Sequence, residues 1–335
     1  MERHGIIVNP AAGLGATFNP AAAKTGDKSY VLLVRSIPEG YLKIGAVNEF
    51  DDKYNSRLSL WEGASPDGAP PDHFILVDPA AIEPGPEGTY DHYGVEDPRI
   101  TKIGDTWYIC YTALAKGLGQ PDAGEGVRIA LASTRDFRTF TKHGVIGPDS
   151  RSKAGTLFES GGRVHFLWKD ENGVERTMLS PAPADLEDPQ AWKKLWADKD
   201  IQHHELLGPQ DNSYESRGIE PGAPPIEIDE GLLVVYSSIS ADFKWTISLL
   251  LLDKNDPDKI IAKTDAPVLV PEEVYELKGD VNNVVFPCGA LIDKGRLYVY
   301  YGAADTVCAV ASESMDVIRK ALKPFQDRPV PGPRP

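Results

Sequence analysis

Four polar segments stand out in this chain because folding alone does not require so many polar side chains at turns. Two carboxylates and an arginine surround a proline in Gly94-Val-Glu-Asp-Pro-Arg99, and a carboxylate follows small residues in Gly302-Ala-Ala-Asp305. Asn19 precedes a proline, and the fourth segment is Tyr214-Glu-Ser-Arg-Gly-Ile-Glu220. Carboxylates and amides hydrogen-bond the hydroxyl groups of neutral sugars, and paired acids commonly cleave glycosidic bonds. These segments predict a carbohydrate site.

Other catalytic signatures are absent from the sequence. It contains no Gly-x-Ser-x-Gly elbow, no His-Glu-x-x-His motif and no phosphate loop. His203, His204 and Glu205 suggest a metal site, but neighbouring residues on a strand point to opposite faces. We therefore prefer to interpret this trio as a surface loop, and we expect neither a metal nor a cofactor.

The elements that would position the polar segments are strands. A turn followed by alternating aromatic and β-branched residues recurs five times, and each run is followed by a second strand pattern. The five pairs are 27–35 with 57–61, 104–112 with 127–132, 162–169 with 176–180, 230–237 with 246–252, and 294–301 with 307–311. Helical patterns are limited to 184–196 and 312–323.

Five such units predict an all-β fold, a five-bladed β-propeller. In a propeller the loops at one end of the axis converge, so carboxylates from different blades can meet around one ligand. A two-sheet sandwich or two β domains is the alternative. We expect residues 1–335 to form a single propeller domain, with a proline-rich C-terminal tail from about 324 to 335 that cannot join a strand ladder.

Charge and hydropathy exclude several kinds of partner. The chain has 35 Lys and Arg residues against 50 Asp and Glu residues, a net charge of −15, whereas nucleic-acid-binding surfaces are basic. No apolar run approaches 18 residues, and the first residues lack the apolar stretch of a signal peptide. We expect no nucleic acid, no membrane and a cytoplasmic location unless a leader has been removed. The sequence predicts no oligomeric state.

The segments 94–99 and 302–305 resemble glycoside hydrolase family 130, the β-mannoside phosphorylases and β-mannosidases. The resemblance runs from Phe18 to Ala311 and includes the segments 127–132, 224–226 and 279–289. It implies a five-bladed propeller that binds β-linked manno-oligosaccharides in a central pocket. It also implies roles for individual residues. Asp97 matches the catalytic aspartate, which protonates the leaving oxygen through the 3-hydroxyl of the mannosyl unit.

Further site residues follow from the same resemblance. Asn19, Arg57 and Asp305 fall where the family contacts the sugar. Glu96 and Arg99 flank the catalytic acid, where they either contact substrate or form an ion pair that fixes the turn.

The sequence departs from the family phosphorylases where they bind phosphate. A Trp-Asp-Ser-x-Lys-Ile-Gly segment of the phosphorylases aligns with residues 214–220, which puts Gly218 at the lysine and Glu220 at a glycine. A Tyr-His-Gly motif becomes Tyr236-Ser237-Ser238, and a His-Arg-Pro segment becomes Leu167-Trp168-Lys169. A phosphate dianion needs several cationic donors, so these changes predict hydrolysis instead of phosphorolysis.

The resulting expectation is an inverting β-mannosidase, with Asp97 as acid and Glu220 as the base that activates water. The losses resemble those of the family's β-1,2-mannosidases, which favours β-1,2-linked substrates. Glu220 could instead be a solvated loop acid. Glu215 is an alternative base, and Glu272, Glu273 and Glu276 provide further candidates.

Two other functions remain open. The first is a β-mannoside phosphorylase that releases mannose 1-phosphate, with inorganic phosphate as co-substrate. Arg217, Lys116 or Lys169 would then replace the missing phosphate contacts. The second is a propeller that binds mannosides without catalysis.

Overall fold

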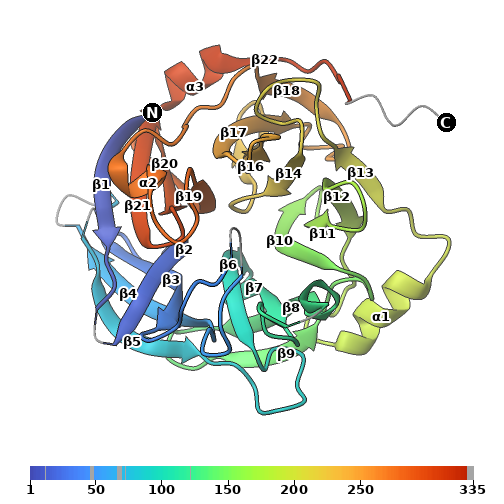
Figure 1. The fold of residues 1–335 in the computed structure, drawn as a ribbon. Coiled ribbons are helices and arrows are strands. Elements are labelled where there is room, and N and C mark those ends of the chain that lie inside the picture. Colours follow the sequence, from blue (N-terminus) through green and yellow to red (C-terminus); the bar gives the residue numbers. More distant parts are fainter. Residues whose placement is uncertain (12, 46–48, 66–69, 72, 121, 330–335) are drawn as a thin grey trace.

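Five antiparallel sheets surround a central axis in the computed structural model, which describes residues 1–11, 13–45, 49–65, 70–71, 73–120 and 122–329 (Figure 1). The predicted five-bladed β-propeller is confirmed, and the sandwich alternative is excluded. Strands β2, β6, β10, β14 and β19 lie nearest the axis, and later strands of each blade lie toward the rim.

The first three blades are consecutive along the chain. Blade 1 contains β2 (Leu14–Lys24), β3 (Ser29–Pro38), β4 (Arg57–Ala64) and β5 (Ile75–Ile82). Blade 2 contains β6 (Gly94–Ile103), β7 (Thr106–Leu114), β8 (Val127–Thr134) and β9 (Thr141–Val145). Blade 3 contains β10 (Ser152–Ser160), β11 (Arg163–Asp170), β12 (Arg176–Pro181) and β13 (His204–Leu207).

The last two blades include strands from the two ends of the chain. Blade 4 contains β14 (Gly218–Pro221), β15 (Ile226–Ile228), β16 (Gly231–Ile239), β17 (Trp245–Leu252), β18 (Ile260–Thr264) and β22 (Leu322–Pro324). Blade 5 contains β19 (Val285–Asp293), β20 (Arg296–Ala303), β21 (Val307–Ser314) and β1 (Glu2–Val8). The helices are the 3-10 turn Ala123–Gly126, α1 (Pro189–Ala197), α2 (Val274–Leu277) and α3 (Met315–Ala321). None of the helices in the described part of the chain has the length and apolarity needed to cross a membrane.

The five predicted strand pairs are the second and third strands of the blades, with β3 and β4 as the first pair and β20 and β21 as the last. Both faces of these strands are buried, because neighbouring blades pack face to face. One apolar cluster joins blades 4 and 5 and includes Leu233, Leu249 and Val299, whereas another joins blades 1 and 2. This burial of both faces is the main stabilising contribution of the architecture.

The first strand and the last described strand of the chain are both attached to blades. Strand β1 pairs with β21, so the N-terminal strand completes the last blade. Near the other end, β22 pairs with β18 at the rim of blade 4. Pro324 therefore pairs with Ala262 of β18, although the sequence predicted that a tail begins there. A proline is tolerated at this position because β22 is the outer edge strand of the blade. Residues 325–329 of the predicted tail also contact the protein, since Pro329 forms an isolated bridge with Gln210, and 330–335 are outside the described residues.

The inner strands are irregular in a repeated way. Each of β2, β6 and β10 contains a β-bulge together with one non-glycine residue in the left-handed region, namely Asn19 (φ 52°), Asp97 (φ 46°) and Ala154 (φ 54°). Bulges redirect side chains and interrupt pairing at free edges. Gly302 is required beside the first bulge, since a Cβ there would lie 2.0 Å from the Asn19 Oδ1 atom. The bulges therefore place Asn19 and Asp97 at the axis.

Candidate active site

A pocket of about 350 Å³ lies over the inner strands, and its lining falls into three groups. Acidic groups and one arginine form the first, namely Glu96, Asp97 and Arg35. The second, which we call the basic wall, consists of Arg151, Lys153, Lys169 and Arg217 and also carries two glutamates. The third is apolar and includes Leu118, Phe243 and Trp245.

Asp97 is held by two donors from blade 1. The Asn19 Nδ2 atom donates to Asp97 Oδ1 at 2.7 Å, and the Arg35 Nη1 atom donates to the same oxygen at 3.0 Å. Arg35 also contacts Glu96 Oε1 at 2.6 Å and the Tyr54 hydroxyl. All of these side chains are buried. The arrangement fixes the orientation of the Asp97 carboxylate and leaves it facing the pocket.

The pKa values of the carboxyl groups in this cluster are shifted in opposite directions. Burial opposes a charge on Asp97, but Arg35, Arg99 and the Asn19 amide outweigh it and hold the pKa of Asp97 below its usual value. Burial raises the pKa of Glu96 in spite of Arg35. Burial also raises the pKa of Asp305 to about 7, with Asp97 among the nearby charges that add to the effect. Groups whose environments push their pKa values apart are typical of acid–base sites.

Arg99 has a positioning role. Its guanidinium is fully buried and donates to three backbone carbonyls, those of Asp97 at 2.8 Å, Pro221 at 2.9 Å and Gly222 at 3.1 Å. These bonds join the β6 bulge to β14 of blade 4. Arg99 therefore holds the turn that carries Asp97 through backbone carbonyls and not through the ion pair with Glu96 considered from the sequence, because Glu96 pairs with Arg35 instead.

The basic wall is assembled from blades 3 and 4. The Lys169 Nζ atom, which is almost fully buried, lies 2.8 Å from Glu175, 2.9 Å from Glu220 and 3.3 Å from Glu171. Although burial opposes the charge on Lys169, these carboxylates keep its pKa raised. Arg217 is different, since its side chain is 40% exposed and is 3.9 Å from Glu175. Its guanidinium lies 4.0 Å from the centre of the Phe243 ring.

Glu220 lies behind this wall. Its side chain is 0% exposed, and besides Lys169 it is 3.4 Å from Lys153 and 3.9 Å from Arg99. Gly218 lies directly beneath Glu175, whose Cβ would be 2.9 Å from a Cβ at position 218. Glu220 thus acts as a counter-ion for the buried Lys169 and the partly exposed Lys153, and it is not among the described residues that line the pocket.

The remaining predicted residues fall into two sets. Asp305, at the β20–β21 turn with φ 54°, is within electrostatic reach of Arg35 and Asp97. Asp305 and Asn19 do not themselves line the pocket, although Asn19 is bonded to Asp97, and Arg57 and Glu215 are also absent from the described residues of its lining. Arg57 lies 4.0 Å from Glu83, and Glu215 is fully buried in a separate network that involves Lys263.

The other candidates from the sequence are also placed. Lys116 pairs with Glu125 at 3.1 Å and does not belong to the described pocket lining, whereas Lys169 and Arg217 do. Glu276, the buried member of the 272–276 cluster, accepts hydrogen bonds from Arg3 and Tyr301. No group of three or more potential metal ligands occurs within the part of the chain that the structure describes.

Several residues of the site were missed by the sequence analysis. Arg35 is the last residue of an alternating strand pattern. It could have been noticed because it is a charged residue on the same strand face as Val31 and Leu33. Arg151 and Lys153 follow a turn and have no recognisable motif. Their proximity to Lys169 depends on strand pairing, because Lys153 lies opposite Lys169 in the β10–β11 ladder.

The chain is similar to known mannoside phosphorylases. The family described as beta-1,4-mannooligosaccharide phosphorylase matches residues 79–323. The 1,2-beta-oligomannan phosphorylase of Thermoanaerobacter sp. is 32% identical over 80% of this chain and 81% of its own length. The beta-1,2-mannobiose phosphorylase of the same organism is 30% identical over 88% of this chain and 89% of its own.

A solved structure has the same fold. The beta-1,2-mannobiose phosphorylase of Listeria innocua, in complex with beta-1,2-mannobiose, superposes with a TM-score of 0.76 and 25% identity. The match covers 96% of this chain and 98% of that one.

The prediction of an inverting β-mannosidase with Glu220 as base is wrong. The curated relatives that match most of the chain are phosphorylases. The physical reason for the error is that a carboxylate at position 220 was expected to repel phosphate. In the structure its charge is neutralised by Lys169 and Lys153, and the pocket surface in front of it is basic.

Proposed function

Because the chain belongs to glycoside hydrolase family 130, we propose that it is a β-mannoside phosphorylase that cleaves β-1,2-linked manno-oligosaccharides and releases mannose 1-phosphate. The phosphate oxygen bonds to the anomeric carbon while the glycosidic C–O bond breaks. Attack from the face opposite the leaving group inverts the anomeric centre from β to α. The leaving oxygen takes a proton that Asp97 delivers through the sugar 3-hydroxyl.

The basic wall is the main observation that supports phosphate as the nucleophile. Four cationic side chains from blades 3 and 4 line one side of the pocket that also contains Asp97. Arg217 is well exposed and only weakly engaged by Glu175, so its planar guanidinium is free to form two hydrogen bonds with phosphate. Lys169 and Lys153 add charge behind it. Arg217 and Lys169 thereby replace the lysine and histidine that other family phosphorylases use.

The acid side of the pocket supports the proton transfer. In the free site the pKa of Asp97 is lowered by Arg35, Arg99 and Asn19, which outweigh its burial, whereas burial raises the pKa of Glu96 and Asp305. The cluster therefore retains a proton near neutral pH. Binding of phosphate adds negative charge and excludes water, and both changes raise carboxyl pKa values. Asp97 becomes a competent acid in the ternary complex.

The β-1,2 linkage rests on similarity. Two relatives that cover most of the chain are named for β-1,2-mannoside substrates, and the Listeria innocua structure holds β-1,2-mannobiose. Pocket size agrees with a short substrate, since about 350 Å³ is near the lower end for small-molecule sites.

Product analysis on a panel of β-1,2-, β-1,3- and β-1,4-mannobiose tests the proposal. With phosphate, β-1,2-mannobiose should give mannose and mannose 1-phosphate in equal amounts, and without phosphate it should remain intact. Arg217→Ala should raise the phosphate KM at least about tenfold while the mannobiose KM stays unchanged. Equal turnover with and without phosphate would overturn the proposal.

A further inference from the structure

The loop 208–217 joins β13 of blade 3 to β14 of blade 4 and carries Arg217 at its end. Two residues before Arg217 the same loop places a fully buried carboxylate, that of Glu215. This carboxylate faces away from the pocket that contains Asp97, because its partners belong to the rim strand β18 and to β16. The proposed mechanism gives it no role.

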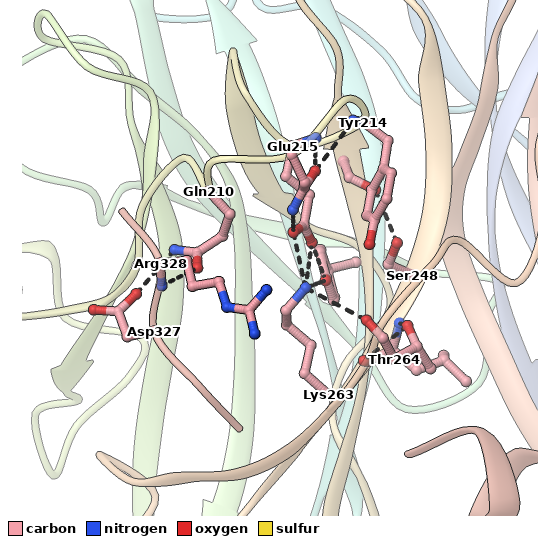
Figure 2. A network of polar contacts seen from close by, with 12 residues as sticks. Gln210, Tyr214, Glu215, Ser248, Lys263, Thr264, Asp327 and Arg328 are labelled. Atoms are coloured by element: carbon pink, nitrogen blue, oxygen red, sulfur yellow. Dashed lines mark hydrogen bonds and ion pairs between the residues drawn. The ribbon is translucent and has the colours of Figure 1, made fainter. Parts of the chain in front are cut away.

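Glu215 is bound by a set of donors that we call the Glu215 anchor (Figure 2). The Lys263 Nζ atom donates to both carboxylate oxygens, at 2.9 Å and 2.8 Å. The Tyr236 hydroxyl donates to Oε1 at 2.5 Å, and the Asn212 Nδ2 atom donates to Oε2 at 2.6 Å. Asn212 also accepts from the Glu215 backbone amide at 2.8 Å. The anchor thus satisfies the buried charge and closes the loop on itself.

The C-terminal segment holds the outer side of the same loop (Figure 2). Gln210 donates to Asp327 at 3.0 Å and accepts from the Arg328 backbone amide at 2.8 Å. The Asp211 amide donates to the Arg328 carbonyl at 2.7 Å. Since β22 is paired to β18, which contains Lys263, these contacts tie the loop to the rim of blade 4.

The anchor and Arg217 meet on one strand. Glu215 is bonded to Tyr236, and the Arg217 backbone amide donates to the Ile239 carbonyl at 3.0 Å, so both attach to the C-terminal part of β16. The next turn of the chain, after β16, carries Phe243, on which the Arg217 guanidinium lies. Buried charge pairs with full hydrogen bonding are rigid and costly to break. The loop therefore has little freedom at the residue that faces the pocket.

We propose that Glu215 and Lys263 are positioning residues for phosphate, which hold Arg217 at the basic wall through the 208–217 loop. This inference rests on the proposed function. It predicts that disrupting the pair weakens phosphate binding selectively, because Arg217 is then no longer held against Phe243 and β16. Mannoside binding should be unaffected, since the acidic side of the pocket, formed by Arg35, Glu96 and Asp97, is built on blades 1 and 2.

Three variants test this role, namely Glu215→Gln, Lys263→Met and the double variant. Blade 5 offers a matched control, Glu276→Gln, because Glu276 is equally buried and bound by Arg3 and a tyrosine hydroxyl, that of Tyr301. We expect both glutamine variants to lower the melting temperature. Only Glu215→Gln and Lys263→Met should raise the phosphate KM, by about tenfold, with kcat and mannobiose KM within about twofold of wild type.

The double variant separates positioning from stability. Removing both charges leaves no uncompensated ion, so its melting temperature should recover toward wild type, whereas its phosphate KM should stay raised. Recovery of both properties, or an equal rise of phosphate KM in Glu276→Gln, would show that the pair acts on stability alone.

A crystal structure of Glu215→Gln keeps this test independent of the reaction. Displacement of the Arg217 guanidinium from Phe243 is expected, and an unmoved Arg217 would overturn the positioning role. If wild type forms no mannose 1-phosphate, the proposed function fails, but the position of Arg217 in this crystal structure still decides whether Glu215 orients it.

Discussion

Replacement of Glu220 by Gln distinguishes a counter-ion from a catalytic base. Glu220 contacts Lys169 at 2.9 Å and Lys153 at 3.4 Å; Lys169 is buried, and Lys153 is partly exposed to the pocket. A base that activates water would be indispensable, and its loss would reduce kcat by about 10²–10⁴. A counter-ion behind the basic wall affects stability and phosphate affinity but not the chemical step.

The stability cost follows from what remains around the lysines. Breaking a buried ion pair costs about 3–5 kcal/mol when one charge is left alone. In this cluster Lys169 keeps Glu175 at 2.8 Å and Glu171 at 3.3 Å, so the lower value, about 3 kcal/mol, is expected. For 335 residues the entropy of unfolding is about 0.7 kcal/mol/K, which converts this loss to about 4 °C in melting temperature.

The phosphate KM should fall in Glu220→Gln, whereas damage to the phosphate site would raise it. Glu220→Gln removes one negative charge near the bound dianion, which is worth on the order of 1 kcal/mol and lowers the phosphate KM by about fivefold. Calorimetry measures the melting temperature, and initial rates with varied phosphate and saturating mannobiose measure kcat and KM. A folded variant with kcat reduced a thousandfold would refute the counter-ion role.

Three further predictions concern the acid cluster and the closure of the propeller. Asp97→Asn should lower kcat by about 10²–10⁴, while calorimetric binding of mannobiose persists; turnover near wild type would exclude Asp97 as the acid. Since the folded-state pKa of Asp305 is raised to about 7, its ionisation destabilises the fold as pH rises from about 4 to above 7. Asp305→Asn should therefore raise the melting temperature at pH 8 but not at pH 4, and equal shifts at both would contradict the raised pKa. Arg3→Ala should cost about 3 kcal/mol because the buried Glu276 loses its cationic partner and keeps hydrogen bonds from Tyr301 and the Glu272 and Glu273 amides, whereas Arg296→Ala, which breaks a more exposed pair, should cost under about 1 kcal/mol in urea unfolding.

The sequence predicted the regular part of the fold because strand alternation marks it. The second and third strands of every blade have long apolar runs, such as β16 and β17, and these were found at nearly their observed bounds. The inner strands were not found. Strand β14 has four residues and ends in proline, and β6 contains a bulge at Asp97 with Pro98 next to it. Bulges and prolines remove the alternation that identifies a strand.

Only part of the site could be predicted from the sequence, for a related reason. Asp97 and Asp305 lie in compact motifs whose chemistry can be recognised locally. The basic wall has no local motif, since Lys153 and Lys169 become neighbours only through the β10–β11 ladder and Arg217 comes from another blade. The error about Glu220 has the same origin. Its charge is visible in the sequence, but the two lysines that neutralise it are distant along the chain.

Phosphorus NMR of a single reaction tests the central claim most directly. The protein is incubated with β-1,2-mannobiose and inorganic phosphate, and the spectrum is followed over time. We predict that the phosphate resonance declines while a phosphomonoester resonance of α-mannose 1-phosphate grows in equal amount to the free mannose. Release of mannose with an unchanged phosphate resonance would contradict phosphorolysis and the role of the basic wall.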